Sequence, residues 1–302
     1  MKKVKAVGIK LMKSQELFDG DVRGVLEVAR LCDRLGVDEV HVSDHVLITG
    51  PGHRGRDGFP YPIDYSGWYE PFALLSAVAT VTERVRLSSH VVVAPLRPAV
   101  LLAKEIATLD VLSGGRVDIG LGLGWQREEF AALGVPFEGR LTRLVEQVEA
   151  CRELWGGAPA TYHGSTVSFD EAYSYPAPVQ GRELPISFGV PAGPRAFAEI
   201  ARLGIGYCPA YYVGADLAGD IAAAREAYAA AGRDPQSLKV TSELTMKPDT
   251  DADGKVDWDA AFAEAEWIIE AGVDVLLTHI RPHCSTAKEI EPFIERLLSL
   301  RE

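Results

Sequence analysis

An adjacent carboxylate and imidazole form the pair in this chain best suited to chemistry. Residues 43–45 read SDH, so Asp44 directly precedes His45. Histidine exchanges protons near neutral pH because its ordinary pKa is about 6.5, and a neighbouring carboxylate can orient the ring. We therefore expect Asp44 and His45 to be catalytic. Trp68 and Glu70 end the long loop after this pair, and with Trp125 they predict an aromatic substrate pocket with few carboxylates.

Two glycine-rich segments could bring the backbone close to a ligand. The first reads GLGLGW (120–125) and includes Gly122 and Gly124, and the second reads GVPAGPR (189–195). Glycine permits close approach, and free amides at the start of a helix suit anions such as phosphate. Tight packing against another strand would explain either segment equally well. At this stage, both interpretations remain open.

The histidine pattern does not favour a metal site. Neighbouring ligands such as an HxH pair or an HExxH helix are typical of bound catalytic metals, and the chain contains neither pattern. A nucleophile is also disfavoured, because GxSxG is absent and Cys208 lies in an apolar strand. We expect no metal in the catalytic site.

The stretch DTDADGKVDWDA (249–260) resembles a calcium loop. Asp249, Asp251, Asp253, Gly254 and Asp257 occupy positions 1, 3, 5, 6 and 9 of such a loop. Position 12 holds an alanine where an EF-hand needs glutamate, and a predicted strand rather than a helix precedes the loop. We interpret the stretch as a polar loop in which Asp257 caps the next helix, with weak calcium binding left open.

Short β-rich runs alternate with amphipathic helical stretches along the whole chain. The predicted strands cover residues 4–10, 38–44, 84–93, 116–122, 185–189, 205–209, 238–246 and 273–280. The predicted helices cover residues 22–35, 69–82, 98–112, 126–133, 138–155, 194–203, 215–231, 257–271 and 286–300.

This alternation predicts an α/β fold with a parallel sheet, and eight units suit a closed (β/α)₈ TIM barrel. An insertion at about 156–184 follows the fourth strand, and residues 1–302 form a single domain because no linker is present. An open doubly wound sheet is the alternative, but its fingerprint glycines are missing after the first strand. In a barrel the active site lies in the loops after the strands, where the candidate residues fall.

The composition is that of an ordinary globular protein. The 302 residues are 47% hydrophobic and 25% charged, and the formal net charge of −12 disfavours nucleic acid and anionic membranes as partners. The four cysteines include no CxxC pair, which fits a reduced cytoplasmic protein. We expect no signal peptide and no membrane-spanning segment.

The run ATLDVLSGGR followed by GLGLGW resembles the luciferase-like monooxygenase superfamily. The resemblance extends from the first strand to about residue 210 and more weakly beyond it. It implies a (β/α)₈ barrel with an insertion, and a cofactor that is either FMN or the deazaflavin coenzyme F420. SDH at 43–45 is similar to the F420-dependent branch, in which an Asp-His pair lies beside the reactive ring.

The same resemblance implies the positions that bind the cofactor. A bulge with a non-prolyl cis peptide is implied near Ser89, His90 and Val91, pressing on the back of the ring. Phosphate contacts are implied in the second glycine-rich loop, at Gly189, Val190, Pro191, Ala192 and Gly193. A homodimer is expected because dimers are common among such proteins.

One departure from the family pattern bears on the substrate. Sugar-phosphate dehydrogenases of the family have a glutamate where this chain has Trp125, which points to a more apolar substrate. The sequence thus predicts a cytoplasmic F420-dependent oxidoreductase acting on a small organic molecule. The alternatives are an FMN-dependent monooxygenase working with a flavin reductase, and a cofactor-free binding protein on a degenerate barrel.

Overall fold

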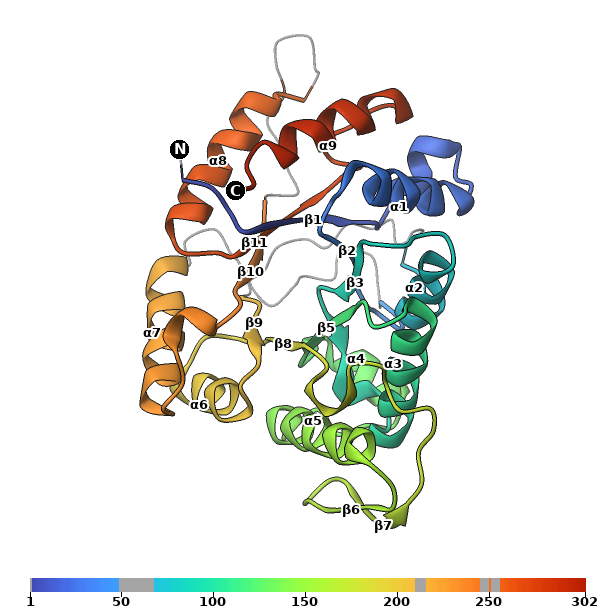
Figure 1. Cartoon of the computed structure of the whole chain (residues 1–302), viewed down its shortest axis with the longest axis vertical. Coiled ribbons are helices and arrows are strands. Elements are labelled where there is room, and N and C mark those ends of the chain that lie inside the picture. Colours follow the sequence, from blue (N-terminus) through green and yellow to red (C-terminus); the bar gives the residue numbers. More distant parts are fainter. Residues whose placement is uncertain (1, 49–67, 210–215, 245–249, 251–255) are drawn as a thin grey trace.

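The computed structural model describes residues 2–48, 68–209, 216–244, 250 and 256–302. Its strands form a parallel sheet in the order β10-β11-β1-β2-β3-β5-β8-β9, with β4 paired to β5 (Figure 1). The barrel strands are β1 (Ala6–Lys10), β2 (Glu39–Val42), β3 (Arg86–Ser89), β4 (Val92–Val93), β5 (Val117–Gly122), β8 (Ile186–Gly189), β9 (Gly206–Tyr207), β10 (Thr241–Glu243) and β11 (Val275–His279).

The two ends of this sheet meet and close the barrel. Tyr207 at the end of β9 forms a parallel bridge with Val240, which directly precedes β10. The Tyr207 amide also donates to the carbonyl of Lys239 at 2.9 Å. The predicted (β/α)₈ barrel is confirmed, and every predicted strand and helix contains an observed element of its type.

Helices follow the strands and surround the sheet (Figure 1). They are α1 (Arg23–Leu35), α2 (Pro71–Ala79), α3 (Ala99–Ser113), α4 (Arg127–Ala132), α5 (Arg140–Gly156), α6 (Pro194–Leu203), α7 (Leu217–Ala230), α8 (Trp258–Glu270) and α9 (Ile290–Leu298). Short 3-10 turns cover Ser14–Phe18, Ala94–Leu96, Gly181–Glu183, Pro235–Ser237 and Ala287–Glu289. Gly36 ends α1 in a left-handed conformation. As predicted, Asp257 caps α8 by accepting from the Ala260 amide at 3.1 Å.

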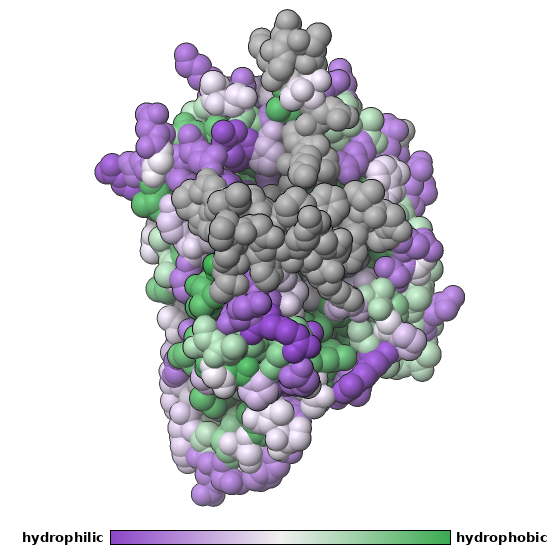
Figure 2. All heavy atoms as spheres, turned by 180° about the vertical axis from the view of Figure 1, so that it is seen from behind, coloured by the Kyte–Doolittle hydropathy of each residue, from purple (hydrophilic) through white to green (hydrophobic). Residues whose placement is uncertain are grey.

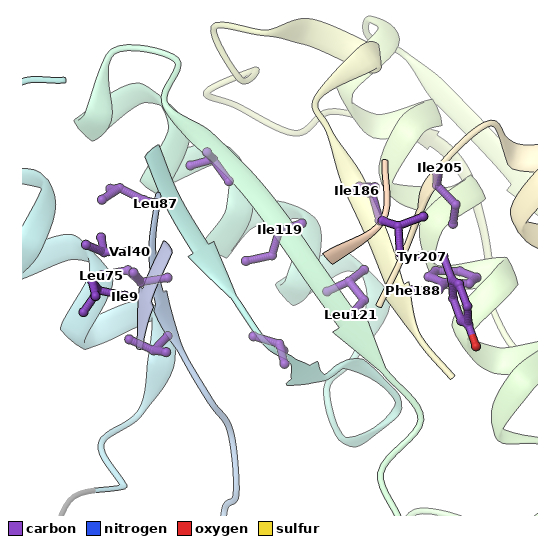
Figure 3. Close-up of a cluster of buried hydrophobic side chains, with 14 of the residues drawn as sticks. Ile9, Val40, Leu75, Leu87, Ile119, Leu121, Ile186, Phe188, Ile205 and Tyr207 are labelled. Carbon is purple, nitrogen blue, oxygen red and sulfur yellow. The ribbon is translucent and has the colours of Figure 1, made fainter. Parts of the chain in front are cut away.

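The hydrophobic core lies between the strands and the helices. Strand side chains alternate between the two faces of the sheet, and the apolar ones face the helices. Figure 3 shows Leu87, Ile119, Leu121, Ile186 and Phe188 in this layer, and all five are buried. These contacts hold the rigid frame that positions the loops after the strands.

The lumen of the barrel is polar instead. Lys239 donates to Glu39 at 2.6 Å and to Asp118 at 2.7 Å, and His41 Nε2 lies 2.9 Å from Glu39. Burial alone would raise the pKa of Glu39, but the charges and hydrogen bonds of Lys239 and His41 together outweigh burial and lower that pKa to about 2. Glu39 and His41 lie on β2, Asp118 lies on β5 and Lys239 lies just before β10, so this network ties three parts of the barrel together.

The predicted insertion after the fourth barrel strand holds an antiparallel hairpin, β6 (Ala160–His163) and β7 (Ser168–Ala172). Glu146 on α5 fastens it, because each carboxylate oxygen accepts from one residue of the turn. Oε1 accepts from the amide and hydroxyl of Ser165, and Oε2 from those of Thr166, at 2.6–2.8 Å.

Hydrophilic and hydrophobic residues are interspersed over the coloured surface seen from behind in Figure 2. Within the described ranges, no helix is both long enough and apolar enough to cross a membrane. Cys32, Cys151, Cys208 and Cys284 are all free and buried. Burial raises the pKa of the Cys208 thiol to about 12, so it is a poor nucleophile.

Candidate active site at the carboxyl end of the barrel

The end of β2 is tied to a bulge in the neighbouring strand. Between β3 and β4 the peptide His90–Val91 is cis, at the position that the family resemblance implied. This bulge divides the single strand predicted over 84–93. Ser43 donates to the His90 carbonyl at 3.0 Å, and the Val93 amide donates to Asp44 at 2.9 Å. The segment that carries His45 is therefore held against both ends of the bulge.

Val91 occupies the bulge, and Val91 and Ser89 together explain three glycines. A Cβ built on Gly122 would lie 2.3 Å from Cγ2 of Val91, and a Cβ built on Gly189 would lie 2.7 Å from Cγ1 of the same residue. At Gly120 the clash is with the Ser89 carbonyl oxygen, at 2.2 Å. Packing of the bulge thus accounts for Gly122 and Gly189, which were predicted to bind cofactor. The side chain of Val91 is only half buried.

Gly124 also has a packing reason. Its φ of +70° favours glycine, and a Cβ there would lie 2.5 Å from Val93 and 3.0 Å from Phe130. The GLGLGW segment therefore turns tightly out of β5 into α4. Packing thus explains the glycines of this segment, and a role for Gly122 and Gly124 at a cofactor stays a prediction.

His45 lies among aromatic rings and a buried carboxylate. Its ring centroid is 4.7 Å from that of Trp68 and 5.4 Å from that of Trp125. Its Nδ1 atom lies 3.1 Å from Oε2 of Glu129, whose side chain is fully buried. The structure brings together the predicted His45, Trp68 and Trp125.

Glu129 was not among the site residues predicted from the sequence. It lies on α4, four residues after Trp125, and comes close to His45 only through the fold. A signal was present, because Gln126, Glu129 and Phe130 follow the i, i+3, i+4 spacing of a buried helix face. All three are buried in the structure. A polar residue on such a face needs a partner, which makes it a candidate site residue.

Asp44 has different partners from those expected. Its carboxylate binds Arg97 at 2.5 and 3.3 Å as well as the Val93 amide. Burial alone would lower the pKa of Arg97, but the carboxylates of Asp44 and Glu70 outweigh it and raise that pKa. Within the described contacts Asp44 is a structural anchor, and a role at a cofactor stays a prediction.

Glu70, predicted for the substrate pocket, caps a helix. Its Oε2 accepts from the Ala73 amide at 2.7 Å at the start of α2, and its Oε1 accepts from Arg97 at 3.0 Å. Both oxygens are thus engaged in holding α2 and Arg97, and the residue is exposed. The described contacts give Glu70 a structural role and place it with Asp44 on the same arginine.

The side chain of Ser89 bonds to the neighbouring strand, and that of His90 lies near charged and polar residues at the carboxyl ends of β1, β10 and β11. Ser89 donates to the Gly120 carbonyl at 2.6 Å. His90 Nδ1 lies 3.9 Å from Glu243, which also pairs with Lys10 at 2.7 Å and with His279 at 3.5 Å. Burial, and then the charge of Lys10, lowers the pKa of His90 to about 3, so this ring is neutral.

The loop 189–193 joins β8 to α6. Val190 is buried in the core, Pro191 is half buried and Ala192 is exposed. Gly193 is the N-cap of α6 without a side-chain cap, and a Cβ there would meet nothing within 4 Å. Packing does not explain this second glycine, and the start of α6 carries amides that an anion could bind.

Among the described residues, no group of three or more His, Cys, Asp or Glu side chains is arranged to hold a metal ion. The calcium-like stretch is described only at residues 250 and 256–260. The predicted loop positions Asp249, Asp251, Asp253 and Gly254 lie outside the described residues.

Fold and site together define a (β/α)₈ barrel with a histidine and two tryptophans beside a cis-peptide bulge. Residues 7–269 match the family model for luciferase-like monooxygenases. The chain belongs to this family of oxidoreductases.

Several known proteins are similar to this chain. An uncharacterised protein of Mycobacterium tuberculosis is 34% identical over 239 residues, covering 77% of this chain and 84% of that protein. The F420-dependent glucose-6-phosphate dehydrogenase of Amycolatopsis mediterranei is 31% identical over 76% of this chain and 66% of that enzyme.

Solved structures share the fold at lower identity. An F420-dependent secondary alcohol dehydrogenase, in complex with an F420-acetone adduct, has a TM-score of 0.79 at 21% identity and covers both chains completely. The oxygenating constituent of a Baeyer–Villiger monooxygenase of Pseudomonas putida, in complex with FMN, has a TM-score of 0.72 at 14% identity and covers 99% and 96%.

Proposed function

We propose that this protein is an F420-dependent oxidoreductase that transfers a hydride between the deazaflavin and a small organic substrate. The observation that carries the proposal is that Ser43 and Asp44, which directly precede His45, bond to the residues on either side of Val91 in the bulge. Support also comes from the F420-dependent relative at 31% identity.

The residues present fit a flat, phosphorylated cofactor. Val91 lies on the bulge and is only half buried, which suits contact with a planar ring. The open position at Gly193 and the uncapped start of α6 suit a phosphate. A bound deazaflavin would supply the hydride donor or acceptor. His45 would hold or move the accompanying proton, or stabilise a developing negative charge.

The surroundings of His45 favour an apolar substrate. Trp68 and Trp125 pack on its ring, and Trp125 stands where the sugar-phosphate dehydrogenases of the family have a carboxylate. A sugar phosphate would gain little from these two indoles, whereas an apolar or aromatic molecule would bury surface against them. The substrate itself is left to screening.

The alternative cofactor is FMN, with a partner reductase, because an FMN-bound monooxygenase shares the fold. Fluorescence titration of the purified protein with F420 and with FMN separates the two. Saturable binding of F420, tighter than that of FMN, supports the proposal. Preference for FMN would support the monooxygenase, and binding of neither would support a cofactor-free binding protein.

His45→Ala tests the catalytic role once a substrate is found. General acid–base contributions are about 10²–10⁴-fold, so turnover should fall by that order while cofactor affinity changes little. His163→Ala, an exposed histidine on the insertion hairpin, is the matched control. Unchanged turnover in His45→Ala would refute the assignment. We also propose that the protein is a cytoplasmic homodimer. Light scattering of the purified protein tests the oligomeric state.

A further inference from the structure

We propose that Glu129 is a positioning residue that fixes the tautomer and orientation of His45. The inference deepens the proposed function, since it concerns how the site prepares its histidine. Its test does not depend on which cofactor binds.

The two oxygens of Glu129 have different partners. Oε2 faces Nδ1 of His45 at 3.1 Å, whereas Oε1 accepts from the Val46 amide at 2.8 Å and is 3.4 Å from the Leu47 amide. Since the side chain is fully buried, these donors replace the water that a carboxylate loses on burial. One residue on α4 therefore holds both the ring and the backbone that follows it.

This arrangement selects a tautomer of the neutral ring. An ionised carboxylate only accepts hydrogen bonds, so the 3.1 Å contact requires the proton on Nδ1. The other nitrogen, Nε2, then carries the lone pair and can take up a proton. If Glu129 were a neutral acid donating to Nδ1, the ring proton would instead sit on Nε2, and the ring would be a donor there.

The neighbouring rings limit other orientations of His45. Trp68 is tilted by 56° to it at 4.7 Å, and Trp125 meets it edge-on at 5.4 Å. Only 5% of the histidine side chain is exposed. Rotation of the imidazole would break the contact with Glu129 and disturb both indole contacts.

A second reading is that Glu129 only fastens the loop through the amides of Val46 and Leu47. Glu129→Gln separates the two roles. Its amide oxygen can still accept from both backbone amides, while its NH₂ group faces Nδ1 and can only donate. If the glutamine side chain flipped, its NH₂ group would face the backbone N–H groups of Val46 and Leu47, and this contact between donors disfavours the flipped orientation. Glu129→Gln should therefore keep the loop and reverse the tautomer.

Nuclear magnetic resonance of the full chain with ¹⁵N-labelled histidine, without cofactor, reads the tautomer directly. Spectra are taken at pH ~9, above the ordinary histidine pKa of ~6.5. The His45 signals are assigned by their loss in His45→Gln. We expect protonated Nδ1 in the wild type, protonated Nε2 in Glu129→Gln, and no change in Glu128→Gln, whose side chain is exposed on the same helix.

Two results would overturn the proposal. One is a wild-type ring protonated at Nε2, which needs no variant and so stands even if Glu129→Gln fails to fold. The other is an unchanged tautomer in a folded Glu129→Gln protein. Because the spectra need no cofactor, a failed F420 titration with the expected tautomers would overturn the proposed function and leave the positioning role in place. With a substrate in hand, Glu129→Gln should lower kcat by about 10²–10⁴-fold with little change in KM.

Discussion

Gly122→Ala tests whether the glycines around the bulge are required for packing. The added methyl would lie 2.3 Å from Val91 Cγ2 and 3.3 Å from the Gly189 carbonyl oxygen. Val91 also packs close to two other glycines, because Cβ atoms built on Gly120 and Gly189 would lie 3.2 and 2.7 Å from its Cγ1. Overpacking of this kind costs about 1–3 kcal/mol, and the lower entropy of the unfolded alanine chain returns about 0.4–1 kcal/mol. We expect a net loss of about 1–2 kcal/mol.

Denaturant unfolding measures this loss, and a double-mutant cycle assigns its cause. Val91→Ala removes the Cγ2 methyl group that the new Cβ would strike, so Gly122→Ala should cost at least about 1 kcal/mol less in that background. Wild-type stability of Gly122→Ala would refute the clash. If Gly122→Ala lowers the unfolding free energy equally with valine and with alanine at position 91, Val91 is not the cause of the loss.

Other substitutions and conditions probe single features of the site and the barrel. Gly193→Val should leave the unfolding free energy nearly unchanged, because nothing lies within 4 Å of its Cβ, and should weaken F420 binding in the fluorescence titration if the loop holds a phosphate. Arg97→Met should destabilise the protein by about 3–5 kcal/mol, because the buried Asp44 carboxylate loses its partner, and denaturant unfolding measures it. Folding lowers the pKa of Glu39 from 4.5 to about 2, so the ionised carboxylate stabilises the protein above pH 4.5 and this stabilisation is lost as the pH falls toward 2. The unfolding free energy of Glu39→Gln should therefore fall less than that of the wild type between about pH 5 and 3. Calorimetry should show no calcium binding tighter than ~0.1 mM, and a micromolar site would contradict our interpretation of residues 249–260.

The alternation of elements was accessible from the sequence because it depends on local patterns. Strands such as 116–122 and helices such as 194–203 are marked by apolar periodicity and by glycines at their ends, and the structure has β5 and α6 there. The position of His45 at the end of β2 followed from the same pattern. Parallel strands with one helix each close into a barrel, so the site end of the molecule was predictable too.

The roles of individual side chains depended on contacts between distant segments. Asp44 was expected to serve His45, but Arg97, 53 residues away, takes its carboxylate, and Glu129, 84 residues from His45, takes the imidazole. The glycines at 122 and 193 look alike in sequence, yet only the first faces a packed neighbour. Local propensity and periodicity are properties of a short segment, whereas a hydrogen-bond partner or a steric clash is set by which segments the closed barrel brings together. The sequence therefore determined the barrel and the end that carries the site, and the tertiary structure decided which carboxylate meets the histidine.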